Sequence, residues 1–445
     1  MKSGDSVHLC SGCGHSAARW FGRCPSCGAW SSATRSGGVA AEELEVVTLE
    51  RSVGGEVRLG TGIVEVDRVL GGGVVPGSVL LLGGEPGIGK STLVLQLLRG
   101  LIERGRSCLL VSGEESPAQV GLRAARLGIP LASLKVAAST SLDAVLAASG
   151  RERPDVLVLD SIQTVELAAV GQSAGSIVQV RECAAALVRH AKDTGTVVVL
   201  VGHVTKDGSV AGPKTLEHVV DAVLTLEGDR SGSLRLLRAA KNRFGSCEET
   251  GVFTMTGRGL EPVPDPSAML LADRRPGGAG SIVFPGIEGS RPVLTEIQAL
   301  VTRSVLAQPR RVAIGVDARR VTLLLGVLRE KVGDRIAASD VFVAAAGGLE
   351  VREPAADLAL CLAVLSALEG VAIASDVIAV GEVGLTGEVR RVPAIERRLA
   401  EAARLGFSSA LVAGRAPALE TTVDVVRVDD VYEAFSALAR LQRAA

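Results

Sequence analysis

A glycine-rich stretch between two apolar runs constrains the fold of this chain more than any other feature of its sequence. Residues 79–82, Val-Leu-Leu-Leu, predict a buried strand, and residues 93–98 predict a helix. Between them Gly84, four further residues and then Gly-Lys-Ser at 89–91 match the phosphate-binding loop pattern, in the strand–loop–helix context that this pattern requires. The stretch therefore predicts a nucleoside triphosphate site; a glycine-rich turn with a chance lysine is the alternative.

The residue types of this loop suit a triphosphate with its magnesium ion. Glycines allow successive backbone N–H groups to converge on phosphate oxygens, and the N-terminus of the next helix adds positive partial charge. Lys90 can reach the β- and γ-phosphates, and the Ser91 hydroxyl can bind Mg²⁺. The predicted ATP-binding residues are Gly84, Glu85, Pro86, Gly87, Ile88, Gly89, Lys90, Ser91 and Thr92.

Residues 58–261 alternate apolar runs with helix-like segments, which predicts an α/β domain with a mainly parallel sheet covered on both faces. Asp160 ends one apolar run, where an acid can bind Mg²⁺ beside the loop, although it could instead cap a helix. Glu114 follows another run and is the first candidate for orienting the attacking water; Glu115 is the second, and both could simply be solvated. His203 ends a third run and could contact the γ-phosphate or form an ordinary hydrogen bond.

Four cysteines near the N-terminus form two C-x-x-C pairs. Each pair can turn two thiolates toward one metal, so residues 1–30 predict a closed zinc site, which so small a unit needs in order to fold. Two disulfides, a redox dithiol and an iron site are the alternatives. The predicted zinc ligands are Cys10, Cys13, Cys24 and Cys27.

Composition limits the partners of this chain. Lys plus Arg (48) nearly equals Asp plus Glu (49), so a polyanion must be met by local patches rather than by the net charge. Aromatic residues make up only 2% of the chain, which argues against base stacking as a major binding device. No signal peptide or apolar run of membrane-spanning length is evident, so we expect a cytoplasmic protein without a membrane partner.

Two segments rich in small residues and proline divide the chain into three parts. Residues 31–57 and 262–280 are expected to be linkers, which leaves a third domain at 281–445. Its stretch from 301 to 335 is locally basic and could contact phosphates or form a solvated face. The basic residues there are Arg303, Arg310, Arg311, Arg319, Arg320, Arg329, Lys331 and Arg335.

In the order of these parts the chain resembles the bacterial RadA (Sms) family of recombination proteins. The resemblance covers nearly the whole sequence and rests on the Cys₄ finger, the phosphate loop and the pentapeptide Lys-Asn-Arg-Phe-Gly at 241–245, which distinguishes this family. It implies a RecA-like P-loop ATPase core, a zinc ribbon-type finger and a Lon-protease-like α+β C-terminal domain.

The resemblance also implies an assembly and an activity. These are a hexameric ring of the DnaB-helicase kind with ATP between subunits, single-stranded DNA in its channel, and branch migration of intermediates made by RecA. In that setting Lys241 and Arg243 act at the subunit interface, on a neighbour's nucleotide or on DNA. From the sequence alone, the same residues could form a basic hairpin.

Lon-like domains can be Ser-Lys peptidases, which need a serine nucleophile and a lysine base. Aligned with the family's motifs, Ala355 occupies the serine position and Glu396 the lysine position, so we expect no protease activity. The domain is expected to serve ring assembly and DNA contact instead. The sequence thus favours a DNA-dependent ATPase motor on single-stranded and branched DNA. An ATP-gated adaptor of RecA filaments without motor activity is the alternative, and an ATP-dependent peptidase is disfavoured.

Overall fold

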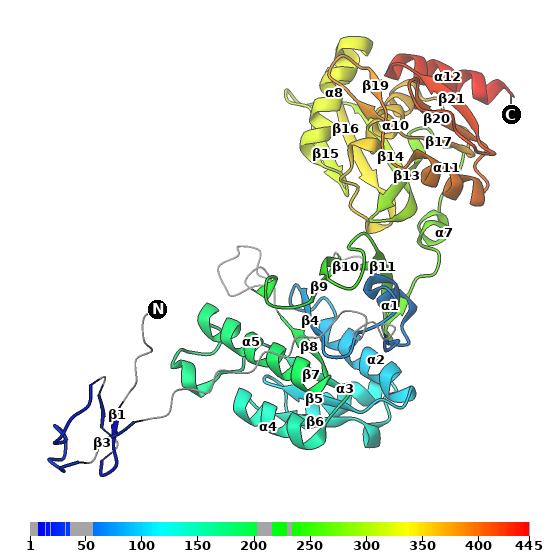
Figure 1. The fold of residues 1–445 in the computed structure, drawn as a ribbon. Coiled ribbons are helices and arrows are strands. Elements are labelled where there is room, and N and C mark those ends of the chain that lie inside the picture. The colour runs from blue at the N-terminus through cyan, green and yellow to red at the C-terminus, as the bar shows by residue number, and fades with distance from the viewer. Residues whose placement is uncertain are drawn as a thin grey trace. The chain divides into compact units, whose positions relative to one another are not determined.

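The computed structural model describes residues 8–13, 15–17, 19–31, 33–35, 57–202, 216–228 and 234–444. The chain divides into two compact units, Met1–Glu56 and Val57–Ala445 (Figure 1). The division falls at the end of the first predicted linker. His203 lies outside the described residues, so its contact with a phosphate stays a prediction.

The first unit contains a small antiparallel sheet with the strand order β2-β1-β3. Its central strand β1 (His8–Cys10) pairs with β2 (Ser16–Ala17) and with β3 (Ala33–Arg35). Strand β3 therefore extends the finger into the segment expected to be a linker. So small a sheet buries little apolar surface, and within the described part of this unit only Cys10 and Cys24 are buried.

The second unit begins with a nine-stranded sheet of order β12-β11-β10-β9-β4-β8-β7-β5-β6. The strands from β9 to β6 in this order run parallel, and the other three pair antiparallel. This arrangement confirms the predicted α/β class with a mainly parallel sheet. The strands are β4 (Val79–Gly84), β5 (Cys108–Ser112), β6 (Lys135–Ala138), β7 (Val156–Asp160), β8 (Val197–Val201), β9 (Ala222–Glu227), β10 (Leu234–Asn242), β11 (Thr250–Thr256) and β12 (Gly259–Pro262).

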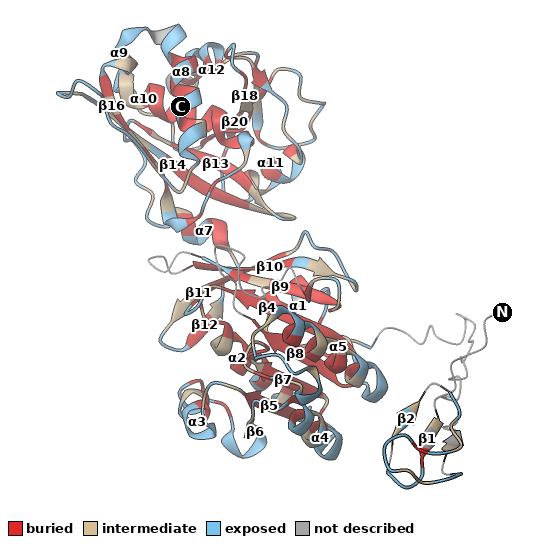
Figure 2. Cartoon of the chain, turned by 90° about the vertical axis from the view of Figure 1, so that its left-hand side faces the viewer, coloured by how far each residue is buried: buried red, intermediate tan, exposed pale blue. Residues whose placement is uncertain are grey.

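Helices cover both faces of this sheet, and its central strands are buried between them (Figure 2). Side chains of β4 alternate between the two faces: Leu80 and Leu82 pack in the core formed with α2, whereas Val79 and Leu81 pack in the core formed with α5. An all-apolar strand is what a sheet covered on both faces requires. The helices are α1 (Val64–Leu70), α2 (Lys90–Glu103), α3 (Pro117–Arg126), α4 (Leu142–Glu152) and α5 (Ile177–Thr194).

The rest of the second unit is built on a seven-stranded mixed sheet of order β15-β16-β14-β13-β17-β20-β21. Helix α10 (Asp357–Glu369) is apolar around most of its circumference and is buried along nearly its whole length. No helix in the described ranges combines the length and hydropathy that a membrane span requires. The strands are β13 (Ser281–Glu288), β14 (Arg291–Arg303), β15 (Arg311–Ile314), β16 (Ser339–Ala345), β17 (Val377–Ala379), β20 (Ser409–Ala413) and β21 (Asp424–Val428), with β18 (Glu382–Val383) and β19 (Val389–Arg390) as a separate pair. The other helices are α8 (Ala318–Val332), α9 (Asp334–Ala337), α11 (Ile395–Arg404) and α12 (Val431–Ala444).

The segment expected to be the second linker, residues 262–280, contains helix α7 (Pro266–Leu271). Asp265 caps this helix by accepting the N–H of Ala268 at 2.9 Å. The buried Ser267 hydroxyl donates to Glu401 at 2.6 Å and accepts the N–H of Leu294 in β14 at 3.1 Å. Part of the linker is therefore an ordered element packed on the C-terminal domain.

Candidate functional site

The phosphate loop connects the end of β4 to the start of α2. Close packing against a backbone oxygen requires glycine at position 84, and a positive φ favours it at position 89. A Cβ on Gly84 would lie 2.6 Å from the carbonyl oxygen of Leu226 in β9, and one on Gly89 would lie 2.7 Å from Met255 Cε in β11. Gly89 also has a positive φ of 118° where it caps α2. The loop is thus held in its curved path by the sheet beneath it.

Lys90 is the first residue of α2 and is only 5% exposed. Its ammonium donates to the carbonyl oxygens of Gly84 at 2.9 Å and Glu85 at 3.0 Å. Burial lowers the pKa of Lys90, while the carboxylates of Asp160 and Glu114 act in the opposite direction. The structure therefore brings together the predicted lysine and both predicted acids at the carboxyl end of the sheet.

Asp160 ends β7, which is separated from β4 by β8 in the strand order. Although β8 lies between the two strands, Asp160 lines the same small pocket as Ser91 and Glu115. A hydroxyl and carboxylates converging beside a phosphate loop are the oxygen ligands that Mg²⁺ prefers. The pair predicted to bind magnesium is close enough in space to share one pocket.

Glu114 follows β5, whose last residue pairs with Asp160 in the ladder between β5 and β7. The hydroxyl of Ser161, a fully buried residue, donates to Glu114 Oε1 at 2.9 Å. Glu115 instead forms an ion pair with Arg123 of α3. These contacts distinguish Glu114 from Glu115, the two candidates for orienting the attacking water that the sequence could only rank. Ser161 is a residue that sequence reasoning missed as part of this site.

The Lys-Asn-Arg-Phe-Gly pentapeptide lies at the other end of the sheet from the phosphate loop. Lys241 pairs in register with Val223 of β9, and Arg243 follows directly after the end of β10. The Lys241 ammonium donates to the carbonyl oxygens of Glu217 and Val220, the latter at 2.7 Å. Because β10 is antiparallel to β9 while β4 is parallel to it, this motif lies level with the amino end of β4.

That placement separates the motif from the loop of its own chain. Strand β4 spans six residues, so its two ends lie about 17 Å apart at a rise of about 3.3 Å per residue. An extended arginine side chain is shorter than this. Arg243 and Lys90 of one chain are therefore presented at opposite ends of the same sheet.

The four cysteines of the finger converge on one point. Their sulfur atoms all lie within 4.8 Å of one another, and Cys10–Cys27 and Cys13–Cys24 are each separated by 3.6 Å. A tetrahedral zinc with Zn–S bonds of about 2.3 Å sets its sulfurs roughly 3.8 Å apart, so the donor set fits Zn²⁺. The four thiols are free cysteines here, and these distances are too long for disulfides.

Both tryptophans of the chain lie exposed on the finger, Trp20 at 65% and Trp30 at 73%. The Arg23 guanidinium lies over the Trp30 ring at 5.7 Å from its centre. The low aromatic content of the whole chain gave no indication that exposed aromatic side chains are concentrated on the finger. Tryptophan fluorescence consequently reports on the finger alone.

Metal removal provides a test of the finger. Chelation is expected to unfold the first unit and leave the second unit unchanged, because the described part of the former buries only Cys10 and Cys24, while the latter has its own cores. Tryptophan fluorescence and limited proteolysis would follow the finger, and circular dichroism the thermal transition of the rest. Cys24→Ser should release the metal, whereas Cys247→Ser, at an exposed cysteine outside the finger, should retain it. A large fall in the main melting temperature on chelation would contradict this independence.

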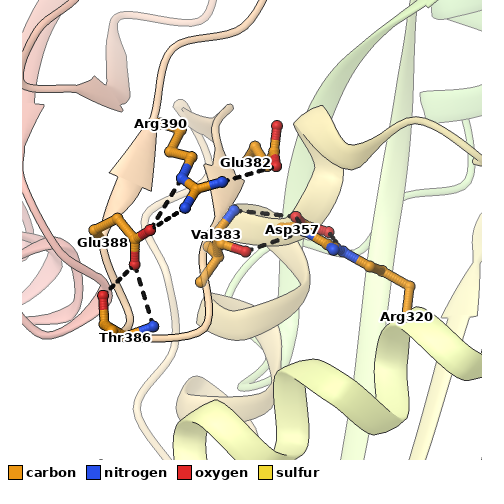
Figure 3. Close-up of polar contacts among 7 residues, drawn as sticks. All are labelled: Arg320, Asp357, Glu382, Val383, Thr386, Glu388 and Arg390. Atoms are coloured by element: carbon orange, nitrogen blue, oxygen red, sulfur yellow. Dashed lines mark hydrogen bonds and ion pairs between the residues drawn. The ribbon is translucent and has the colours of Figure 1, made fainter.

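The position aligned with the Lon serine lies in a buried turn of the C-terminal domain. Ala355 is 4% exposed and precedes α10, and Glu396 lies exposed in the first turn of α11. Asp357, two residues after Ala355, is fully buried and accepts hydrogen bonds from Arg320 and from the N–H of Val383 (Figure 3). The Arg320 guanidinium also donates to the Val383 carbonyl at 3.0 Å.

This ion pair ties α8, α10 and β18 together beside the alanine. On β19 and its turn, a second group of contacts is more exposed: Glu388 accepts from Thr386 and Arg390, and Arg390 also reaches Glu382 (Figure 3). The carboxylate Glu388 is held by these hydrogen bonds, which lower its pKa to about 2. The region is therefore an ion-pair network without a nucleophile at the aligned position.

Breaking the buried pair should destabilise the domain strongly. Arg320→Ala would leave Asp357 buried with only a backbone partner, which is expected to cost on the order of 3 kcal/mol. Burial already raises the pKa of Asp357, and losing Arg320 would raise it further. A raised folded-state pKa means that acidification favours the fold, so the deficit should be largest at neutral pH and shrink as the pH falls through that pKa.

Urea unfolding across this pH range would measure the effect. Arg319→Ala is the matched control, because Arg319 is the neighbouring arginine on the same helix but is exposed. Equal effects of both variants, or a deficit that does not change with pH, would contradict the role given to the buried pair.

Comparisons with known proteins match three separate parts of the chain. Residues 8–33 match a rubredoxin metal-binding domain, residues 57–209 match an AAA domain, and residues 325–415 match the ChlI subunit of Mg-chelatase. With the sheets described above, these matches confirm the predicted fold class: a zinc ribbon, a P-loop ATPase core and a Lon-like C-terminal domain.

Curated relatives match over nearly the whole chain. The DNA repair protein RadA of Pseudomonas aeruginosa is 46% identical over 98% of this chain and 100% of its own length. RadA of Escherichia coli is 45% identical over 92% of this chain and 93% of its own, and RadA of Bacillus subtilis is 44% identical over 93% of both. With this level of identity across finger, ATPase core and C-terminal domain, the chain belongs to the RadA family of DNA repair proteins.

Proposed function

We propose that this protein is a DNA-dependent ATPase that moves on single-stranded DNA and promotes branch migration of recombination intermediates made by RecA. The observation that carries the proposal is the placement of two sets of charged residues. Lys90, Glu114 and Asp160 gather at the carboxyl end of the central sheet, while Lys241 and Arg243 lie at its amino end. As two half-sites, these groups would complete each other between neighbouring copies of the chain.

The first half-site has the groups needed to bind and hydrolyse ATP. The loop residues Gly84 to Thr92 would hold the phosphates with backbone N–H groups, and Lys90 would leave the loop carbonyls for phosphate oxygens. Ser91 and Asp160 would hold Mg²⁺, which neutralises charge on the phosphates when bound. Glu114, oriented by Ser161, would position the attacking water and accept its proton.

The second half-site would act on a neighbour's nucleotide. A cation supplied in trans stabilises the charge that spreads over the transferring phosphoryl group. Arg243 retains half of its side-chain exposure, so it can reach beyond its own chain. This requirement favours a closed ring of subunits, and we propose a hexamer in the cytoplasm with DNA in its channel.

The remaining parts would serve the assembly. The finger would bind Zn²⁺ through Cys10, Cys13, Cys24 and Cys27 and contribute to partner recognition, with RecA as the proposed partner. The C-terminal domain would support the ring and contact DNA through its basic residues. A peptidase is not proposed, because Ala355 offers no nucleophile.

The experiment is steady-state ATP hydrolysis with and without single-stranded DNA, together with unwinding of a forked duplex. We expect DNA to accelerate turnover and ATP to drive directional unwinding. Three results together would contradict a motor: ATP turnover unaffected by DNA, no unwinding, and stimulation of turnover by RecA. They would instead indicate an ATP-gated adaptor on RecA filaments. Raising the salt concentration should weaken the stimulation by DNA, because protein contacts with phosphates release counterions from the DNA.

A further inference from the structure

We propose that Asp221 is the positioning residue that holds Arg243 ready for a neighbour's nucleotide. The inference rests on the proposed function, because it requires Arg243 to act in trans. It assigns a role to a buried acid that lies outside both half-sites and that the pattern of the sequence did not single out.

Asp221 immediately precedes β9, and its side chain is only 8% exposed. One carboxylate oxygen, Oδ2, accepts the N–H of Val79 at 3.0 Å. The other, Oδ1, accepts a hydrogen bond from Arg243 Nη1 at 3.0 Å. Each oxygen of this carboxylate therefore has a different partner.

Backbone hydrogen bonds fix the same three residues. The Asp221 N–H donates to the Val79 carbonyl at 2.9 Å, and the Arg243 N–H donates to the Asp221 carbonyl at 3.1 Å. Val79 begins β4, the strand that ends in the phosphate loop. The backbone of Arg243 is thus connected, through Asp221, to the strand that leads into the phosphate loop of its own chain.

The anchored arginine still faces outward. Its side chain is 50% exposed, although one guanidinium nitrogen is held by the carboxylate. Ordering a long side chain in advance removes the entropy that it would otherwise lose on contact, and a charge-assisted hydrogen bond is strong enough to do so. The remaining guanidinium N–H groups are available in a fixed direction.

Asp221 also balances the charge of the motif. Burial and the nearby Arg243 lower the pKa of Lys241, while Asp221 and Glu217 oppose that shift. Without the carboxylate, two cations would repel each other at the end of one hairpin. Loss of this charge would therefore release Arg243, whereas Lys241 would keep its two backbone carbonyl partners.

The Asp221→Asn variant distinguishes a role in positioning Arg243 from a role in stabilising the fold. The asparagine carbonyl can still accept the Val79 N–H, but its amide group then presents N–H donors to a guanidinium that needs an acceptor. We expect the variant to melt within a few degrees of the wild type and to hydrolyse ATP about tenfold more slowly, with little change in KM for ATP.

Asp155→Asn is the matched control for this substitution. Asp155 likewise precedes a parallel strand, accepts the N–H of Ser107 at 2.7 Å, and lies 3.7 Å from the guanidinium of Arg106. It is on the same sheet but has no connection to Arg243. The control variant should hydrolyse ATP at the wild-type rate.

Mixed oligomers provide the readout that a structural role would not change. Lys90→Ala subunits lack a working nucleotide site but offer a correctly held Arg243, whereas Asp221→Asn subunits offer the reverse. In rings reassembled from both, each intact site beside a Lys90→Ala subunit receives a working arginine. We expect the mixture to hydrolyse more ATP per Asp221→Asn subunit than the Asp221→Asn protein does alone.

The same mixture with Arg243→Ala separates the two levels of the proposal. Complementation with Arg243→Ala but not with Asp221→Asn would overturn the role of Asp221 and leave the trans arginine standing. No complementation in either mixture would overturn the trans arginine itself. Wild-type hydrolysis by Asp221→Asn alone would also overturn the inference.

Discussion

Replacing Lys90 with alanine is expected to abolish ATP hydrolysis and to weaken nucleotide binding. Removing one group that stabilises transition-state charge costs at least about 100-fold in turnover, and Lys90 also serves binding of the ground state. DNA stimulation and strand movement should be lost with hydrolysis. Steady-state hydrolysis and titration with a fluorescent ADP analogue would measure the two effects.

The same variant should remain folded. Burial lowers the pKa of Lys90, so removing the ammonium relieves a desolvation cost, which offsets part of the loss of its hydrogen bonds to the Gly84 and Glu85 carbonyls. Lys135→Ala is the matched control: Lys135 forms an exposed ion pair with Glu152 on the same domain. Residual hydrolysis near the wild-type level in Lys90→Ala would mean that the phosphate loop is not the catalytic site.

Elements defined by local pattern were predicted well from the sequence. The run predicted as a strand at 79–82 lies within β4, and the segment predicted as a helix at 93–98 lies within α2. The phosphate loop was predicted because its glycine spacing and its flanking strand and helix are all local in sequence. Metal-ligand spacing revealed the cysteine cluster for the same reason.

Features that depend on strand order could not be predicted. The position of β8 between β4 and β7 is a property of the whole sheet, and no local pattern around Asp160 indicates it. The contact of Ser161 with Glu114 joins residues 47 positions apart, and neither residue has a local pattern that indicates it. Asp221 is hidden in the same way, because its partners come from two other segments.

One missed element did carry a local signal. The second expected linker was assigned from its prolines, yet Asp265 followed by Pro266 is a typical helix start, with a capping side chain and proline at the first helical position. The finger's extra strand β3 carried none, since three residues are too few for a periodic pattern. Short elements such as these were therefore harder to predict from the sequence than the large ones.

Glu114→Gln is expected to give an enzyme that binds ATP but does not turn it over. The glutamine carbonyl can keep the hydrogen bond from Ser161, so the side chain should stay in place while the proton acceptor is lost. General base catalysis contributes about 100- to 10,000-fold, and kcat should fall within that range. Nucleotide binding should stay near the wild-type level, which distinguishes this variant from Lys90→Ala.

Two further variants test the assignment of Glu114 over its neighbour. Ser161→Ala removes only the orienting hydrogen bond, so kcat should fall by about tenfold with KM for ATP nearly unchanged. Glu115→Gln is the matched control, because Glu115 is already paired with Arg123, and it should retain most of the activity. An inactive Glu115→Gln beside an active Glu114→Gln would reverse the roles of the two acids. Equal loss in all three would indicate that the turn as a whole, rather than one carboxylate, supports hydrolysis.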